Sequence, residues 1–432
     1  MNREKILESF IKNSDMLEER NSAGIEKYRK GDFTLRFPAA KPGQSVKITQ
    51  KKHSFLFGTT AFMLGSFEKA EKEPVYKEKF TNLFNQAVVP LYWSALEPRE
   101  GELRFRKDSE FIYRRPPVDT VLEFCNEYGL QPKGHCLTWN NTLPGWLARY
   151  TPEEKKQILE RRFREISAAY ADKIPSFDIV NESASNYRRG VKGLFENYDE
   201  YGLRLGEKYF GNNRKILNET NEAIWRDYYT EGKYMAFNTQ LKEFIARGVP
   251  FDEIGLQYHI FSTTEETEQW QIREVYLDAE AMVEVLDLLG AYGYPMHISE
   301  ITIPGSGGKA ENEEIQAYLV EKLYKTWFAT PHMKSIVWWN LVDGYAAYAP
   351  LGTNEGENRC GGGLLRFDMS EKPAYKVLDT LINREWKTNL TAEIGGKNEV
   401  TFRGFYGEYE IETCGKTYTV TLDKNGVSVT LK

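Results

Sequence analysis

Cysteine and histidine are scarce in this sequence, and neither residue type is clustered. The 432 residues include four cysteines and five histidines. The cysteines show no CxxC spacing, which speaks against a disulfide framework or a zinc site. No HxH or HExxH pattern is present, so the histidines form no recognisable motif for a catalytic metal. We therefore expect no bound metal and no cofactor.

Long apolar runs and blocks of one charge are also missing. No stretch approaches the roughly 18 apolar residues that a membrane-spanning helix needs. The charged, helix-like start has neither the apolar segment nor the small-residue cleavage site of a signal peptide. The 57 Lys and Arg are interspersed with 63 Asp and Glu, for a net charge of −6. We predict a cytoplasmic protein that binds neither membranes nor nucleic acid. The sequence does not indicate its oligomeric state.

Short apolar runs alternate with long amphipathic stretches from about Phe55 to Ile382. This pattern is typical of βα units around a parallel sheet. The eight runs with the pattern of buried strands begin at Phe55, Gln86, Gln131, Ser176, Lys215, Glu253, Pro295 and Ser335. Helical patterns lie between them, for example from Pro152 and from Ala279. A doubly wound sheet would need a glycine-rich turn after its first strand, and GTTAFMLG is not one. The pattern predicts an α/β fold, a (β/α)8 TIM barrel.

The two ends of the chain have a different pattern. Residues 33–54 and 399–432 both alternate apolar and polar residues, and DKNG before VSVTLK is typical of a hairpin turn. Neither segment is long enough to fold well alone. We therefore predict that both join one small accessory β-sandwich. The expected division is 1–54 for an N-terminal helix and strands of the accessory domain, 55–387 for the barrel, and 388–432 for the remaining strands.

Polar residues end several of the predicted barrel strands. Catalytic groups of such barrels lie at the carboxyl ends of the strands, where the βα loops form the site. The polar strand ends are Gly134, His135, Trp139 and Asn140; Asn181 and Glu182; Asn218; Gln257 and His259; Glu300; and Trp338, Trp339 and Asp343. Two carboxylates therefore converge, Glu182 from the fourth strand and Glu300 from the seventh.

Two converging carboxylates suit the hydrolysis of a glycosidic bond. One carboxyl group protonates the leaving oxygen, and the other attacks the anomeric carbon. The first needs a raised pKa while the second must stay ionised, so we expect different surroundings for Glu182 and Glu300. Asn181, directly before Glu182, could hydrogen-bond a sugar hydroxyl.

Two motifs around these carboxylates point to a known family. FDIVNE, which ends at Glu182, is similar to the acid/base motif WDVVNE, and HISEITI around Glu300 is similar to the nucleophile motif ITELDI. Both motifs are those of glycoside hydrolase family 10, the endo-1,4-beta-xylanase family, which the chain resembles. The resemblance implies a retaining enzyme with Glu182 as the acid/base and Glu300 as the nucleophile.

Further motifs follow in the family's order over residues 55–380. GLQYH is similar to GLQxH, and NETN to NDYN. GHCLTWNNTLPGW is close to GHTLVWHxQxPxW, YWSALEPREGELRF to KWxxxEPxxGxFxF, and GGLLRFDMSEKPAY to LLFDxxxxPKPAY. Together they imply four supporting residues, Asn181, Gln257, His259 and Asn218, and the NETN motif also includes Asn221. For contacts with the substrate we predict Trp139, Asn140, Trp339, His135 and Tyr92.

Several positions depart from the family's pattern, mainly where it binds the glycone sugars. The replacements are Tyr92 for Lys, Val89 for Asn, Asn140 for His, Thr142 for Gln, Thr302 for Asp and Ala347 for Trp. Specificity depends on such contacts, because a buried polar group left unpaired discriminates strongly. We therefore predict a divergent member with altered glycone subsites, which acts on an oligosaccharide or a small β-glycoside.

Other functions stay open at this point. The chain could be a β-glycosidase for a non-xylan glycoside, or a barrel that binds glycans without cleaving them. The accessory sandwich could be a carbohydrate-binding module, because it contains Phe402, Phe405, Tyr406, Tyr409 and Tyr418. Their alternation fits a buried face, so we predict a structural role, in which deletion of 388–432 lowers stability and leaves substrate affinity unchanged.

Overall fold

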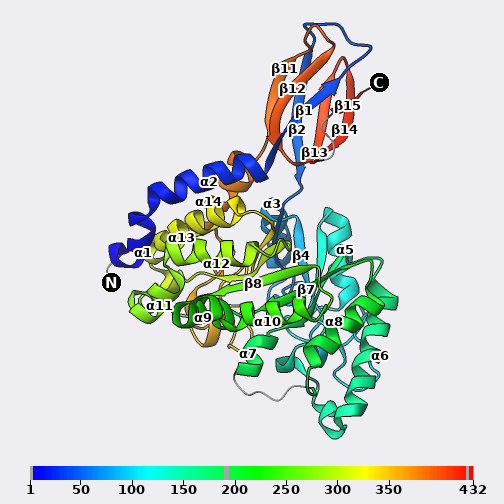
Figure 1. Cartoon of the computed structure of the whole chain (residues 1–432), viewed down its shortest axis with the longest axis vertical. Coiled ribbons are helices and arrows are strands. Elements are labelled where there is room, and N and C mark those ends of the chain that lie inside the picture. The colour runs from blue at the N-terminus through cyan, green and yellow to red at the C-terminus, as the bar shows by residue number, and fades with distance from the viewer. Residues whose placement is uncertain (1–2, 189–193, 425–427, 432) are drawn as a thin grey trace.

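Eight parallel strands close into a barrel in this computed structural model, which describes residues 3–188, 194–424 and 428–431 (Figure 1). The strands, in the order in which they neighbour one another around the barrel, are β10 (Met333–Trp338), β3 (Leu56–Thr60), β4 (Gln86–Pro90), β5 (Gln131–His135), β6 (Ser176–Asn181), β7 (Arg214–Glu219), β8 (Glu253–His259) and β9 (Met296–Thr302). Each matches one predicted run, and the predicted TIM barrel is confirmed.

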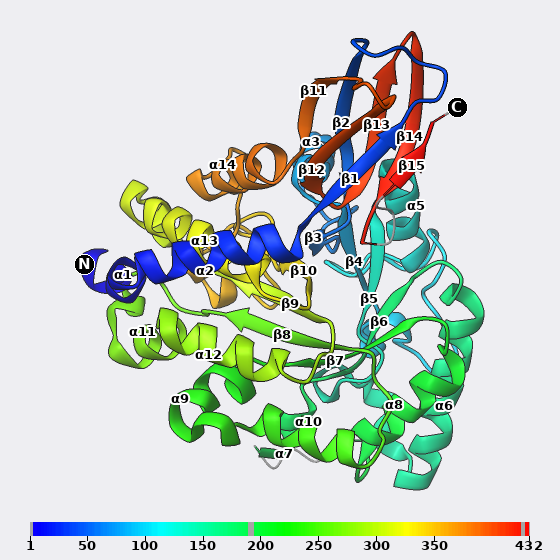
Figure 2. The same ribbon diagram turned by 45° about the horizontal axis from the view of Figure 1, so that its top comes forward.

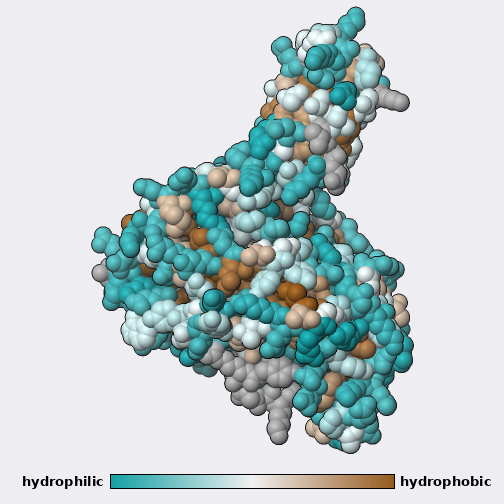
Figure 3. Space-filling model, viewed as in Figure 1, coloured by the Kyte–Doolittle hydropathy of each residue, from teal (hydrophilic) through white to brown (hydrophobic). Residues whose placement is uncertain are grey.

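Most residues of the barrel strands are buried because both faces of the strands are covered. All residues of β6, β8 and β9 are buried, as expected of parallel strands enclosed by helices. The predicted helices α6 (Pro152–Tyr170) and α12 (Ala279–Gly290) begin at side-chain caps, which Thr151 and Asp278 provide. The face drawn in Figure 3 is largely hydrophilic, with separate apolar patches. No helix of the described residues is long and apolar enough to span a membrane.

Segments from both ends of the chain form the accessory domain, as predicted. One sheet has the order β12 (Glu399–Phe405), β1 (Lys30–Arg36), β15 (Ser428–Thr430), and the other has the order β11 (Asn389–Glu393), β2 (Ser45–His53), β13 (Gly407–Thr413), β14 (Lys416–Leu422). The two sheets share a core of their own, which includes Leu35, Ile48 and Ile411. The domain projects from the barrel beside β3 (Figure 1).

The predicted hairpin at DKNG is wrong, because the strands before and after it do not pair with each other. Strand β14 pairs with β13, whereas β15 pairs in parallel with β1 in the opposite sheet. Of the turn itself, residues 425–427 lie outside the described part of the chain. The strand β15 instead covers an edge of β1 that would otherwise be open, a pairing that joins residues almost 400 positions apart.

The N-terminal helices belong to the barrel and not to the accessory domain, which corrects the predicted division within residues 1–54. Helices α1 (Arg3–Lys12) and α2 (Ser14–Tyr28) bury Phe10 and Leu17 in the barrel core. Helix α2 packs on α13 (Ala310–Ala329) (Figure 2). Gly24 allows this close approach, because a Cβ there would lie 2.4 Å from the carbonyl oxygen of Ala329. The remaining domain boundaries stay a prediction.

The accessory domain supplies a test of its structural role. Phe402 and Tyr409 are buried in the sandwich core, and Phe405 is buried in the barrel core, so none of the three offers a face to a sugar. We expect Phe402→Ala to lower the free energy of unfolding by about 3–5 kcal/mol, with KM for a soluble substrate unchanged. Thr401→Ala, at the exposed neighbouring position, should change stability by less than about 0.5 kcal/mol. Thermal unfolding and initial rates measure both, and a raised KM in Phe402→Ala would support a binding role.

Candidate active site

The predicted carboxylates Glu182 and Glu300 meet at the carboxyl-terminal mouth of the barrel. Glu182 follows β6 and is 9% exposed, and Glu300 lies in β9 and is 4% exposed. The Gln257 amide bridges them, because its Nε2 donates to Oε1 of Glu182 and to Oε1 of Glu300, at 3.0 Å each. The two oxygens are therefore separated by at most twice that distance. This is shorter than the roughly 6.5–9.5 Å that inverting glycosidases use.

The surroundings of Glu182 suit a proton donor. Its Oε2 accepts hydrogen bonds from Trp139 Nε1 at 2.9 Å and from Asn141 Nδ2 at 3.5 Å. Burial raises the pKa of Glu182, and the charge of Glu300 raises it further, against the opposing hydrogen bonds from Gln257 and Trp139. Its backbone has a φ of +58°, unusual for a residue other than glycine. Such backbone strain is typical of functional positions.

Three nitrogen donors converge on Glu300, as an ionised nucleophile requires. Asn218 Nδ2 donates to Oε1 at 2.9 Å and Gln257 Nε2 to the same oxygen at 3.0 Å, while His259 Nε2 lies 3.2 Å from Oε2. Strand register aligns these groups, because Gln257 pairs with Glu300 across β8 and β9, and Asn181 pairs with Asn218 across β6 and β7. Asn218 also donates to Asn181 Oδ1 at 2.7 Å. The structure thus brings all four predicted supporting residues together.

The ring of His259 also contacts Thr302. His259 Nδ1 lies 2.9 Å from Thr302 Oγ1. A threonine hydroxyl can donate to a ring nitrogen or accept from it. Thr302 therefore orients the ring whose other nitrogen faces Glu300.

His135 lies below the pair, in a buried charged network. Its Nδ1 is 2.7 Å from Asp178 Oδ2, an oxygen that also accepts from Lys133 Nζ at 2.6 Å. Burial alone would raise the pKa of Asp178, but the charge of Lys133 and the hydrogen bond from His135 bring it below its usual value. The free ring nitrogen of His135 lies 3.9 Å from Glu300 Oε1. At 1% exposure, His135 sits where it can orient the nucleophile.

The predicted substrate-binding side chains flank the pair on one side. Trp139, Asn140 and Trp339 are partly buried, and Tyr92 is 3% exposed. Trp339 packs edge-on to His259 with ring centres 5.7 Å apart, and Tyr92 packs on Trp139 at the same separation. Neither amide atom of Asn140 has a partner among the described residues, so this side chain is available to a ligand.

Glu219 is a buried acidic residue that the sequence analysis missed. Its carboxylate accepts hydrogen bonds from the backbone N–H groups of Ala184 and Thr220, both at 2.8 Å, and so holds the turn that follows Glu182. Burial raises the pKa of Glu219 to about 8 against the hydrogen bond from Thr220, and the charge of Glu182 adds to the rise. The acidic residue in the motif NDYN, retained in NETN, was the available signal. Asn221 of the same motif instead contacts the Tyr276 hydroxyl.

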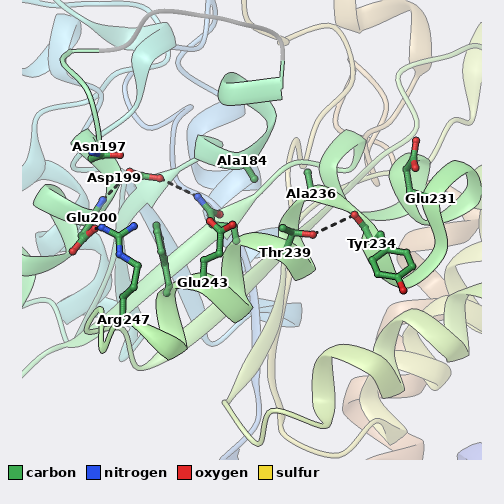
Figure 4. A pocket seen from close by; sticks show the side chains of 12 residues that line it. Ala184, Asn197, Asp199, Glu200, Glu231, Tyr234, Ala236, Thr239, Glu243 and Arg247 are labelled. Carbon is green, nitrogen blue, oxygen red and sulfur yellow. Dashed lines mark hydrogen bonds and ion pairs between the residues drawn. The ribbon is translucent and has the colours of Figure 1, made fainter.

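A pocket of about 530 Å³ lies apart from the carboxylate pair, between α8 (Tyr198–Tyr209) and α10 (Ala236–Ala246) (Figure 4). Glu200 pairs there with Arg247, and Asp199 accepts a hydrogen bond from Gln240. These charged groups are engaged with one another, and we assign the pocket no ligand. Within the described ranges, no three His, Cys, Asp or Glu side chains gather as a metal site.

The fold and this site define a class of protein, the (β/α)8 barrels that carry a catalytic pair of carboxylates on the fourth and seventh strands. The sequence pattern of Glycosyl hydrolase family 10 matches residues 47–379. The chain belongs to that family.

Individual relatives are distant in sequence. Endo-1,4-beta-xylanase 2 of Arabidopsis thaliana is 24% identical over 407 residues, which are 89% of this chain and 32% of that protein. Endo-1,4-beta-xylanase B of Thermotoga neapolitana is 24% identical over 68% of this chain and 79% of its own. Native xylanase 10B of Thermotoga maritima superposes with a TM-score of 0.59 at 22% identity, covering 77% of this chain and 96% of that one, which supports the fold. The chain spans 32–47% of the three Arabidopsis xylanases that it matches.

Proposed function

We propose that this chain hydrolyses β-glycosidic bonds with net retention, through a covalent glycosyl-enzyme on Glu300. The shared Gln257 amide carries the proposal, because it holds one oxygen of each carboxylate 3.0 Å from the same nitrogen. That spacing leaves no room for the separate water that an inverting mechanism places between the sugar and its base. The nucleophile must then be a carboxylate of the protein.

In the first step Glu300 attacks the anomeric carbon of the sugar, and the bond from that carbon to the leaving oxygen breaks. Glu182 gives its proton to the leaving oxygen and becomes a carboxylate. The raised pKa of Glu182 keeps this proton bound to a higher pH than an exposed carboxyl group would. His259 and Asn218 hold Glu300 on the line of attack.

In the second step a water molecule attacks the same carbon, and the bond to Glu300 breaks. Glu182 takes one proton from the water, whose oxygen stays on the sugar, so both carboxyl groups return to their starting forms. The charge of Glu300 is one cause of the raised pKa of Glu182. In the glycosyl-enzyme that charge is absent, which lowers the pKa of Glu182 and prepares it to act as the base.

The substrate that we propose is an oligosaccharide or a small β-glycoside. The relatives named above are xylanases, and we propose a xylanase-like reaction. In this chain Tyr92 and Val89 replace polar residues of the family's glycone subsites, so the sugar that is bound need not be xylose. We further propose a cytoplasmic location, in which only imported oligosaccharides or small glycosides reach the enzyme.

The test is covalent labelling by 2-deoxy-2-fluoro-β-glycosides with activated leaving groups. We expect a xyloside, glucoside or cellobioside of this kind to inactivate the protein and leave one sugar on the peptide that contains Glu300, because the fluorine slows the second step. Proton NMR of turnover should show the β-anomer formed first. An α-product would rule out retention. Absence of both labelling and turnover would favour a barrel that binds glycans without cleaving them.

A further inference from the structure

Residues Tyr113–Arg115, which we call the strap, connect the loops that follow three adjacent barrel strands. The strap belongs to the loop after β4. The Arg114 N–H lies 3.2 Å from Ser66 Oγ, in the loop after β3. The Arg114 guanidinium donates to the carbonyl oxygen of Tyr345 and to Asn340 Oδ1, in the loop after β10. The strap therefore closes the barrel mouth over β10, β3 and β4.

The strap is held in one conformation. Arg104, which is 5% exposed, donates to the carbonyl oxygens of Ala95, Glu110 and Arg115, and so fixes the loop from inside. Two prolines follow at 116–117, directly before α5 (Val118–Tyr128), and they restrict the backbone there. Arg114 itself is 2% exposed. These contacts hold the strap in one position. We call the strap together with Glu357 the wall.

Aromatic side chains lie against the strap. The Arg115 guanidinium lies over the Tyr92 ring, 4.1 Å from its centre, and 5.4 Å from the centre of the Phe62 ring. Tyr92 in turn packs on His135 and Trp139, with ring centres 5.4 and 5.7 Å away. Trp139 donates to Glu182. The ring of Tyr92 therefore lies between Arg115 and a side chain that contacts the catalytic pair.

Glu357 adds a second charged group to this wall. It lines a crevice with Phe261, Thr302 and Asn340. Its Oε2 is buried and has no hydrogen-bond partner in the described part of the chain. Burial raises the pKa of Glu357 and the charge of Glu300 adds to it, while His259 and Arg114 oppose the rise. Thr302 in the same crevice contacts His259, so the Glu357 carboxyl group lies near the histidine that faces Glu300.

We infer that the strap and Glu357 close the glycone side of the cleft, so that the enzyme removes single sugars from the non-reducing ends of short β-glycosides, with Arg115 and Glu357 binding hydroxyls of the terminal sugar. The inference rests on the proposed function and adds the mode of action to it. A carboxylate accepts a hydrogen bond from one sugar hydroxyl, and a guanidinium donates a hydrogen bond to the neighbouring hydroxyl of the same sugar. An internal segment of a polysaccharide would have to pass through the strap.

Product analysis of wild-type protein tests the mode of action. The probes are tetrasaccharides of β-1,4-linked xylose or glucose, each labelled at its reducing end. We expect labelled products to shorten by one sugar at a time, with free monosaccharide released from the start. Labelled disaccharide formed before any trisaccharide would overturn the inference while leaving the proposed function intact. If neither turnover nor labelling of Glu300 occurs, both are overturned.

Two variants test the residues of the wall. We expect Arg115→Ala and Glu357→Gln each to lower kcat/KM for aryl β-monoglycosides about 100-fold, the effect of losing a hydrogen bond between a charged group and a sugar hydroxyl. Labelling of Glu300 at saturating inactivator should survive in both. The matched controls are Arg106→Ala and Glu355→Gln, exposed residues near the same segments, with rates equal to the wild type. Wild-type kcat/KM in both Arg115→Ala and Glu357→Gln would contradict the proposed role of the wall.

Discussion

Replacement of Glu300 by Ala is expected to lower kcat/KM for every β-glycoside substrate by at least about 10⁴-fold. The variant lacks the atom that forms the covalent bond. A water molecule in its place would face Gln257, Asn218 and His259, which contact the carboxylate in the wild type, and would have no carboxylate at that position to take its proton. Initial rates on a panel of aryl xylosides, glucosides, cellobiosides and arabinosides measure the effect. Active-site titration of the wild type gives the concentration of active enzyme to which the rates are referred.

The control for this variant comes from the same strand. Ser299 is 1% exposed, and its hydroxyl has no partner among the residues that the structure describes. Ser299→Ala changes β9 next to the nucleophile and should retain wild-type activity, with both variants as stable as the wild type in thermal unfolding. If Glu300→Ala kept more than about one hundredth of the activity on any substrate, Glu300 would not be the nucleophile.

The barrel could be predicted because its strands carry their own signal. Runs such as FDIV are rich in large apolar residues, since parallel strands are buried on both faces, and every residue of β6 is buried. The pairing of β15 could not be predicted in this way. DKNG favours a local hairpin, but β1 offers an open edge, and no local pattern records which edge is open. The two N-terminal helices likewise show an apolar face without showing that α13 covers it.

The catalytic pair was predictable for a geometric reason, because the carboxyl ends of barrel strands converge whatever the loops do. Glu182, Glu300 and their four supporting residues all follow from that rule and from the family motifs. The wall does not. Arg114 contacts Tyr345, 231 positions along the chain, and Glu357 lies in a single short 3-10 helix, Gly356–Cys360, between β10 and α14 (Pro373–Thr380). Such contacts depend on loop conformations that hydrophobic periodicity does not encode.

Replacement of Glu182 by Ala should separate the two steps of the reaction. The dinitrophenolate group of a dinitrophenyl glycoside leaves without taking up a proton, so the glycosyl-enzyme should still form. Its hydrolysis should be slow, because no base takes the proton of the attacking water. We expect kcat to fall by about 10²–10⁴-fold. Azide has no proton to lose, so it should restore turnover and give the β-glycosyl azide. Glycosides with poor leaving groups should not be rescued. A variant that azide does not accelerate would remove Glu182 from the role of base.

The pH profile tests the acid role of Glu182. Burial, and then the charge of Glu300, raise the pKa of Glu182, so it keeps its proton to a higher pH than an exposed carboxyl group does. Activity requires this protonated form in the first step and should fall as the pH rises through the raised pKa. In Glu182→Ala no such group titrates, so the basic limb that the wild type shows in kcat/KM for a glycoside with a poor leaving group should be absent from the residual activity of the variant. A basic limb at the same pH in the variant would assign it to another group, because a residue that has been removed cannot titrate.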